Sequence, residues 1–294
     1  MTDCPILVWM LAMNREYSQK EYDACYSVVK TCVEHATIAY EPANPETFRQ
    51  LMANLLPLLM MRHRRVPRSK WLDKGMQNGK HWIWEATDSR RQTPEGIPPE
   101  GFMPSTIGIG YHLAYQRSLC GIAMVQGRQD KVVNIGLGMK FIGVEPNGVP
   151  VAAYIASFAH KLTTIERQNI APELGDEVAL RRLCTLLALK AAYINAIGEP
   201  LETFDWARLE FDAAGKAVRC DGKPLLGWDF RVWRAALGVA HRYRMIDEHY
   251  QCVCAFLRGG ETTLVFHETH MELESWVQFI DIDQMIKVLP QLTT

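Results

Sequence analysis

The chain has 294 residues, of which 48% are hydrophobic and 22% are charged, so it can bury the core of one large domain or of two ordinary ones. It carries 32 Lys and Arg against 33 Asp and Glu, which gives a net charge of −1. A dedicated nucleic-acid-binding protein usually has a basic excess, so the composition does not favour that class.

The N-terminal apolar segment from Pro5 to Met13 is expected to form a buried first strand. It is too short to span a bilayer as a helix, and it follows Asp3 where a signal peptide would carry cations. No other segment reaches the roughly 18 uninterrupted apolar residues of a membrane span. A leaderless chain with eight cysteines favours reduced thiols and a cytoplasmic location, with no membrane partner.

Two helices are expected after this strand. Ser18 and Glu21 form a capping box, and apolar residues then recur at helical spacing. Asn44 and Pro45 begin the second helix as its N-cap and first helical residue. Pro57 lies inside the apolar pattern of this helix and is expected to kink it.

A basic run closes the second helix. The sequence MMRHRRVPRSKW, residues 60–71, holds five Lys and Arg residues and no carboxylate. Cations in a last helical turn face the negative end of the helix dipole, which stabilises each by about 0.3–1 kcal/mol when exposed. The run is therefore expected to be a charged helix terminus and loop, with a phosphate-contacting patch as the alternative.

The pattern then changes from helix to strand. Strands are expected at HWIWEA, STIGIGYHLAY, LCGIAMVQ and KVVNIGLG, with a stiff loop over residues 94–101. Because the later connections are short, these strands are expected to pair as antiparallel neighbours.

Helices return after residues 145–150. Pro150 is expected to begin one helix, and Asp176 begins another that ends at Gly198. Two hairpins are expected next, turning at residues 214–215 and 259–260, before a short final helix over residues 282–292.

The order of two helices followed by strands thus occurs twice. It predicts an α+β protein of two similar-sized halves, residues 1–147 and residues 148–294, each with two helices followed by antiparallel strands. A single domain of two layers is the alternative.

No motif in the chain fixes a chemistry. Neither G-x-G-x-x-G before a helix, nor a P-loop, nor G-x-S-x-G is present, so no cofactor, catalytic residue or metal site is predicted. The alternative is an enzyme with a site near His112 and Cys120, as base and nucleophile. A metal site at Glu268, His270 and Glu272 is a second version of that alternative.

The C-terminal region carries an acidic run without any Lys or Arg between residues 261 and 283. We expect these carboxylates, with one aromatic anchor, to bind a basic partner, and a solvated surface is the alternative. The predicted partner-binding residues are Glu261, Glu268, Glu272, Glu274, Trp276, Asp281 and Asp283.

Two segments carry a resemblance. The segments IGIGYHLAYQRSLCGIAMVQGRQDKVV, residues 107–133, and PLLGWDFRVW, residues 224–233, resemble immunity proteins paired with nuclease toxins of bacterial type VI secretion. The resemblance implies a cytoplasmic, non-enzymatic protein that binds and neutralises one cognate toxin. It implies no catalytic residues and leaves the oligomeric state open.

Overall fold

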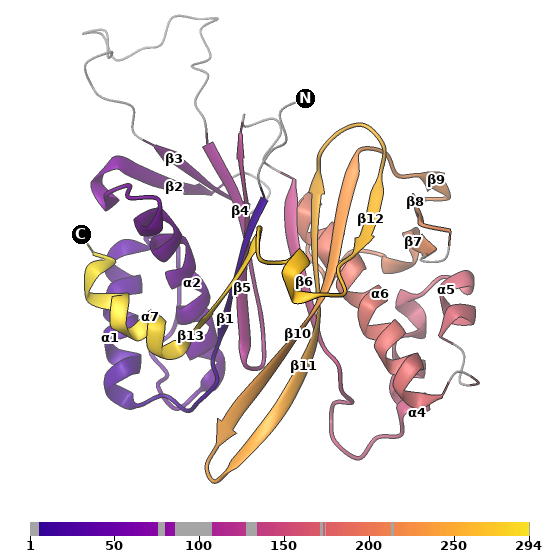
Figure 1. Ribbon diagram of the computed structural model, residues 1–294, viewed down its shortest axis with the longest axis horizontal. Helices are drawn as coiled ribbons and strands as arrows, with labels where there is room; N and C mark the ends of the chain where they lie inside the picture. The colour runs from indigo at the N-terminus through magenta and orange to yellow at the C-terminus, as the bar shows by residue number, and fades with distance from the viewer. Residues whose placement is uncertain are drawn as a thin grey trace, which may run out of the picture.

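The computed structural model describes residues 6–75, 80–85, 108–127, 134–170, 173, 175–212 and 215–293. The predicted α+β class is confirmed, because the described residues form helices and three sheets, two of which combine parallel and antiparallel pairing (Figure 1). The predicted loop over residues 94–101 lies outside the described residues.

The first sheet has the strand order β13-β1-β5-β4-β3-β2. Its strands are β1 (Ile6–Ala12), β2 (Trp71–Gly75), β3 (His81–Glu85), β4 (Gly108–Gln116), β5 (Leu119–Gly127) and β13 (Val277–Asp281). Three helices cover its outer face, α1 (Gln19–Cys32), α2 (Pro45–His63) and α7 (Ile282–Val288) (Figure 1).

The two N-terminal helices begin where the sequence predicts. Ser18 caps α1, with its hydroxyl accepting from the Glu21 amide at 3.3 Å and the Glu21 carboxylate accepting from the Ser18 amide at 2.7 Å. Asn44 caps α2, and Pro45 occupies its first position. The helix continues through Pro57 to His63.

The second sheet has the strand order β12-β10-β11-β6. Its strands are β6 (Ile135–Phe141), β10 (Trp228–His241), β11 (Arg244–Leu257) and β12 (Thr263–Phe266). A third, small sheet joins β7 (Leu209–Asp212), β8 (Ala217–Cys220) and β9 (Lys223–Pro224). The long helix α6 (Asp176–Ile197) covers the second sheet and ends at Gly198 in the left-handed conformation.

Two C-terminal predictions are wrong. The expected hairpin at Gly259–Gly260 does not form, because β11 and β12 lie on opposite sides of β10, and β12 pairs with β10 in parallel. The helix expected from Pro150 is broken into α4 (Val151–Ser157), a 3₁₀ turn and α5 (Thr164–Asn169). The short final helix α7 and the end of α6 at Gly198 agree with the predictions from the sequence.

Strand β1 shows how the layers are stacked. Trp9 and Leu11 belong to the core under α1 and α2, whereas Val8 and Met10 belong to a second core. That second core lies between the two sheets and includes Cys252 and Cys254 of β11. The layers are therefore helix, sheet, sheet and helix.

The two-halves arrangement is not confirmed. Strand β13 from the C-terminal region pairs in parallel with β1, and β6 pairs with β11. Pairing thus crosses the predicted boundary between residues 147 and 148 in both directions. That boundary stays a prediction. Among the described residues, no helix is long and apolar enough to cross a bilayer.

Candidate active site at the junction of the two sheets

The outer edge of β6 meets β4 through side chains. The Leu137 amide donates to Nδ1 of His112 at 3.3 Å, and the Phe141 amide donates to the Gln116 side chain at 2.8 Å. Asn195 of α6 donates to the Leu137 carbonyl at 3.0 Å. Among the described residues, β6 pairs through its backbone with β11 on one side and lies at the edge of its sheet, and these bonds satisfy that edge and join the two sheets here.

A cavity of about 540 Å³ opens beside this junction. We call it the junction cavity. Its wall is formed by the turn after α1, the middle of α2, the start of β3, β4, and the C-terminal end of α6. The polar and ionisable residues lining it are His35, Thr37, Gln50, Asn54, Lys80, His81, Tyr111, His112, Tyr115, Asn195 and Glu199.

Lys80 places a cation in this wall. Its side chain is 7% exposed, and its ammonium donates to the Ala196 carbonyl and, at 3.5 Å, to the Asn134 side chain. Ala196 is in the last turn of α6, where the helix dipole favours a positive charge. Burial lowers the pKa of Lys80 to about 8, so the ammonium is still mostly charged at pH 7.

His112 is a neutral imidazole beside this cation. Burial, with Lys80 and His81 nearby, lowers the pKa of His112 to about 3. Because Nδ1 accepts from the Leu137 amide, the ring proton lies on Nε2. A cation and an imidazole with perturbed pKa values in one cavity are typical of a functional site.

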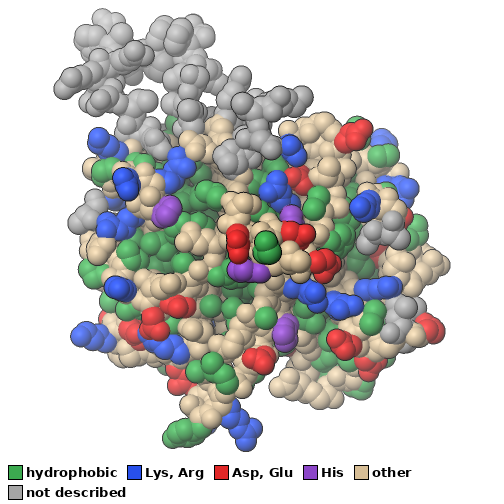
Figure 2. Space-filling view, in the orientation of Figure 1, with side chains coloured by type: hydrophobic (Ala, Val, Ile, Leu, Met, Phe, Trp, Pro, Cys, Tyr) green, Lys and Arg blue, Asp and Glu red, His purple; other side chains and the backbone are tan. Residues whose placement is uncertain are grey.

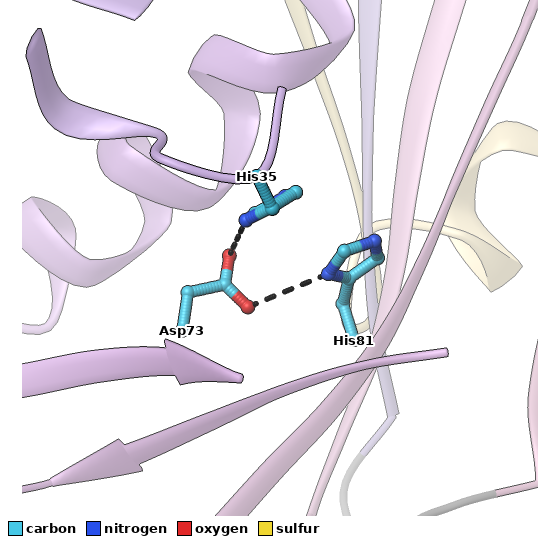
Figure 3. Close-up of side chains that lie close together, drawn as sticks. All are labelled: His35, Asp73 and His81. Carbon is cyan, nitrogen blue, oxygen red and sulfur yellow. Dashed lines mark ion pairs between the residues drawn. The ribbon is translucent and has the colours of Figure 1, made fainter. Parts of the chain in front are cut away.

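A second group of ionisable residues lies at the cavity's edge, where Asp73 of β2 meets two histidines (Figure 3). Its carboxylate is 3.8 Å from Nδ1 of His35 and 3.7 Å from Nδ1 of His81. The Tyr111 hydroxyl donates to the same carboxylate at 2.6 Å. Burial and the Asp73 charge raise the pKa of Tyr111 well above its usual value.

Of the catalytic pair that the sequence offered as an alternative, His112 and Cys120, only His112 lines the cavity. Cys120 is 0% exposed in the interior of β5, and its thiol points to the Arg49 carbonyl, 3.6 Å away. Burial raises the pKa of Cys120 far above that of a free thiol, so it is not an available nucleophile.

The metal group that the sequence offered as an alternative, Glu268, His270 and Glu272, is not brought together as ligands. The Glu272 carboxylate accepts from the Glu268 and Thr269 amides and so caps a short 3₁₀ turn. His270 is exposed. Within the described part of the chain, one group of three His, Cys, Asp or Glu residues has metal-like spacing, and it is His35, Asp73 and His81.

The acidic run is partly neutralised by distant residues. Asp283 pairs with Arg15 at 2.6 Å, and Glu268 pairs with Arg234 at 3.4 Å. Figure 2 shows acidic side chains interspersed with Lys and Arg on the face it draws. The binding role of the seven predicted residues stays a prediction.

Trp276, however, is not an exposed anchor. It is 6% exposed and packs edge-on against Trp233, with ring centroids 5.2 Å apart. It therefore belongs to the core between the sheets, which is the usual location of a large aromatic side chain.

The basic run at the end of α2 lines a different cavity, of about 700 Å³. Arg62 donates to the Gln291 carbonyl at 3.2 Å, and Arg68 donates to the Cys32 carbonyl at 3.0 Å. Arg68 also lies over the Trp71 ring, 4.4 Å from its centroid. These arginines bind neighbouring segments, which agrees with the prediction of a helix terminus and loop.

Sequence reasoning missed most of the junction cavity. Lys80 and His81 lie at the start of a strand as an ordinary polar pair, and nothing in their spacing relates them to His35 or Asp73. Asn195 is one polar residue near the end of an apolar helix. The sequence pattern therefore gave no signal for the group.

No protein-family model matches the chain. The chain is 28% identical over 208 residues to the 4′-phosphopantetheinyl transferase pptA of Paxillus involutus. This similarity covers 66% of the chain and 71% of the relative. The relative is an enzyme.

This similarity contradicts several predictions from the sequence. The resemblance to immunity proteins, the neutralisation of a toxin, the toxin partner and the absence of enzymatic activity are all overturned by similarity to a transferase. The two short segments that carried that resemblance are β4, β5 and the start of β10, ordinary core strands. The enzyme alternative is better supported.

Proposed function

We propose that this protein transfers a 4′-phosphopantetheinyl group and that the donor's phosphates bind in the junction cavity. The reaction class is taken from the similar transferase of Paxillus involutus. The position of the donor's phosphates is taken from the buried ammonium of Lys80 and the imidazole of His112, two residues that line the same cavity. That juxtaposition is the observation that carries the proposal. The cytoplasmic location expected from the sequence is part of the same proposal.

The natural donor for such a transfer is coenzyme A, in which a phosphoanhydride joins phosphopantetheine to an adenosine nucleotide. A hydroxyl oxygen of a carrier protein would bond to the phosphorus that bears the pantetheine. The phosphorus–oxygen bond to the nucleotide then breaks, the electron pair leaves with the nucleotide, and the hydroxyl proton passes to water. Negative charge therefore grows on the phosphate oxygens during the step.

Lys80 is suited to stabilise that charge. A cation on a nearly buried side chain attracts phosphate oxygens more strongly than it would in water. Without a ligand its ammonium donates to carbonyl groups, so a phosphate would compete with the Ala196 carbonyl for the same donor. The nearly buried position of Lys80 supports this assignment over any exposed lysine.

His112 would respond to the donor. A bound phosphate puts negative charge near the ring, which favours its protonated form and raises its pKa. Because Nδ1 accepts from the Leu137 amide, the neutral ring carries its proton on Nε2, which is a hydrogen-bond donor. A cavity of about 540 Å³ is also within the usual range for small-molecule sites.

The direct test is transfer itself. Purified protein is incubated with coenzyme A and a panel of unmodified carrier proteins, and the mass of each acceptor is measured. We expect one acceptor to gain one phosphopantetheinyl group. Lys80→Met and His112→Asn should each lower kcat/KM about 10–100-fold, the loss expected for one hydrogen bond to a charged group.

Lys223→Met and His160→Asn are the matched controls, because both residues are exposed and neither lines the cavity. They should leave the rate unchanged. Binding of coenzyme A that depends on Lys80, without transfer to any acceptor, would refute the transferase activity and retain the site. Equal binding of coenzyme A by the parent, Lys80→Met and His112→Asn would refute the site.

A further inference from the structure

Three ionisable side chains from separate elements meet at the edge of the junction cavity. His35 comes from the turn after α1, Asp73 from β2 and His81 from the start of β3 (Figure 3). Their nearest ligand atoms all lie within 4.8 Å of one another. The two imidazole rings lie side by side, with centroids 4.1 Å apart, and the Asp73 carboxylate faces both.

Two atoms in this group have no hydrogen-bond partner among the residues that the structure describes. Oδ1 of Asp73 and Nδ1 of His81 are both buried, and neither makes a hydrogen bond. They face each other across 3.7 Å, which is too long for a hydrogen bond. Buried polar atoms without partners are costly, so a native pair of them needs an explanation.

The separations suit a shared metal ion. Two ligands about 2.1 Å from a tetrahedral zinc ion lie about 3.4 Å apart. The His35 Nδ1 to Asp73 Oδ2 distance is 3.8 Å, and the His81 Nδ1 to Asp73 Oδ1 distance is 3.7 Å, each a few tenths of an ångström above this value. Binding through Oδ1 of Asp73 and one nitrogen of each histidine would require these side chains, whose ligand atoms lie within 4.8 Å of one another, to move closer together.

The donor set indicates which ion. Two imidazole nitrogens and one carboxylate oxygen suit zinc, whereas magnesium takes oxygen ligands and water. The Tyr111 hydroxyl holds the other oxygen of Asp73 at 2.6 Å, which is the kind of outer contact that orients a ligating carboxylate. We propose that His35, Asp73 and His81 form a zinc-binding site.

The site would open to the junction cavity. His35 and His81 line that cavity, and the Asp73 carboxylate faces both of them (Figure 3). Three protein ligands leave a fourth position of a tetrahedral ion for water or a ligand oxygen. The site goes beyond the proposed function, and metal binding can be tested without any coenzyme A or acceptor.

The test uses the full chain, freed of metal with a chelator and then titrated with zinc. We expect one ion per chain by calorimetry, and cobalt in place of zinc should give the visible absorption of a four-coordinate ion. Asp73→Asn and His81→Asn should weaken zinc binding by more than about 100-fold. His270→Ala is the control, since that exposed histidine is outside the group, and it should bind zinc like the parent.

Tyr111→Phe provides a variant that keeps all three ligands. It should weaken zinc about 10–100-fold, as the loss of an outer contact to a ligand does. No stoichiometric binding by the parent chain would overturn the proposal. Equal binding by the parent, Asp73→Asn and His81→Asn would overturn it as well, because the ion would then sit elsewhere.

Discussion

His112 is kept neutral by its surroundings, and this should make the stability of the protein sensitive to acid. Its pKa is lowered to about 3 by burial, with Lys80 and His81 adding to the effect. An unfolded imidazole has a pKa of about 6.5, so on acidification the unfolded chain takes up this proton first. The contribution of His112 to the free energy of unfolding is therefore fully present at neutral pH and is lost as the pH falls below about 6.5.

When the pH falls from about 7 to about 5, protonation of the His112 imidazole in the unfolded chain should lower the free energy of unfolding by up to about 2 kcal/mol. Asparagine at this position cannot titrate, and its side-chain oxygen can still accept from the Leu137 amide. Urea denaturation of the parent and of His112→Asn at both pH values measures the difference. The prediction fails if both proteins lose the same free energy on acidification.

At the scale of elements, one buried ion pair fixes the short segments around α6. Lys190 of α6 and Glu166 of α5 are both fully buried, with 2.7 Å between the ammonium and the carboxylate. The ammonium also donates to the Trp206 carbonyl at 2.9 Å, and the carboxylate accepts from the Phe211 amide at 2.9 Å. The pair therefore links α5, α6 and β7, which have few regular contacts of their own.

Lys190→Met should destabilise the protein by about 3–5 kcal/mol, because it leaves the Glu166 carboxylate buried without its cation. Burial lowers the pKa of Lys190, and the Glu166 charge opposes that change. The double variant Lys190→Met with Glu166→Gln should lose less than the single variant, since no charge is then stranded. Urea unfolding of the two variants checks this, and equal losses would contradict it.

The sequence predicted helix boundaries correctly where they depend on residues that are close together in the chain. The capping box of α1 and the glycine that ends α6 depend on neighbouring residues, so they could be read directly. Strand pairing depends on residues that are far apart in the chain, and here one prediction was wrong. Gly259 and Gly260 do form a turn, but it carries the chain across β10 to its far side, and the hairpin is instead formed by β10 and β11.

The glycines of β6 make the same point. Added Cβ atoms at Gly136 and Gly138 would lie 2.2 Å from the Ala192 carbonyl oxygen and 2.1 Å from that of Ala188. Glycine is needed there because α6 packs directly on the strand. The sequence showed glycines without a nucleotide motif, and could not show the helix that requires them.

The group of His35, Asp73 and His81 could not be predicted from the sequence either, because only the first sheet and its connections bring these residues together.

At the scale of the whole molecule, the cavity depends on how the two sheets are joined. Side chains of β4 and α6 bond to the free edge of β6. The walls of the junction cavity come from the first sheet, from the helices that cover it and from the end of α6, which covers the second sheet. The long β10–β11 hairpin extends away from this region, and exposed apolar side chains gather at its tip (Figures 1 and 2). Tyr243 there is 101% exposed and Met245 is 69% exposed.

This interdependence predicts how fragments behave. Residues 1–147 lack β13, which pairs with β1, and they lack the buried Ile282 and Met285 of α7. Residues 148–294 lack β6, against which α6 packs. We expect neither fragment to unfold cooperatively when purified alone, because each loses part of its sheet and core. Co-expression should recover a complex with the melting transition of the intact chain, measured by near-ultraviolet circular dichroism. A cooperative transition in residues 1–147 alone would instead establish an independent N-terminal domain at the boundary that the sequence predicts.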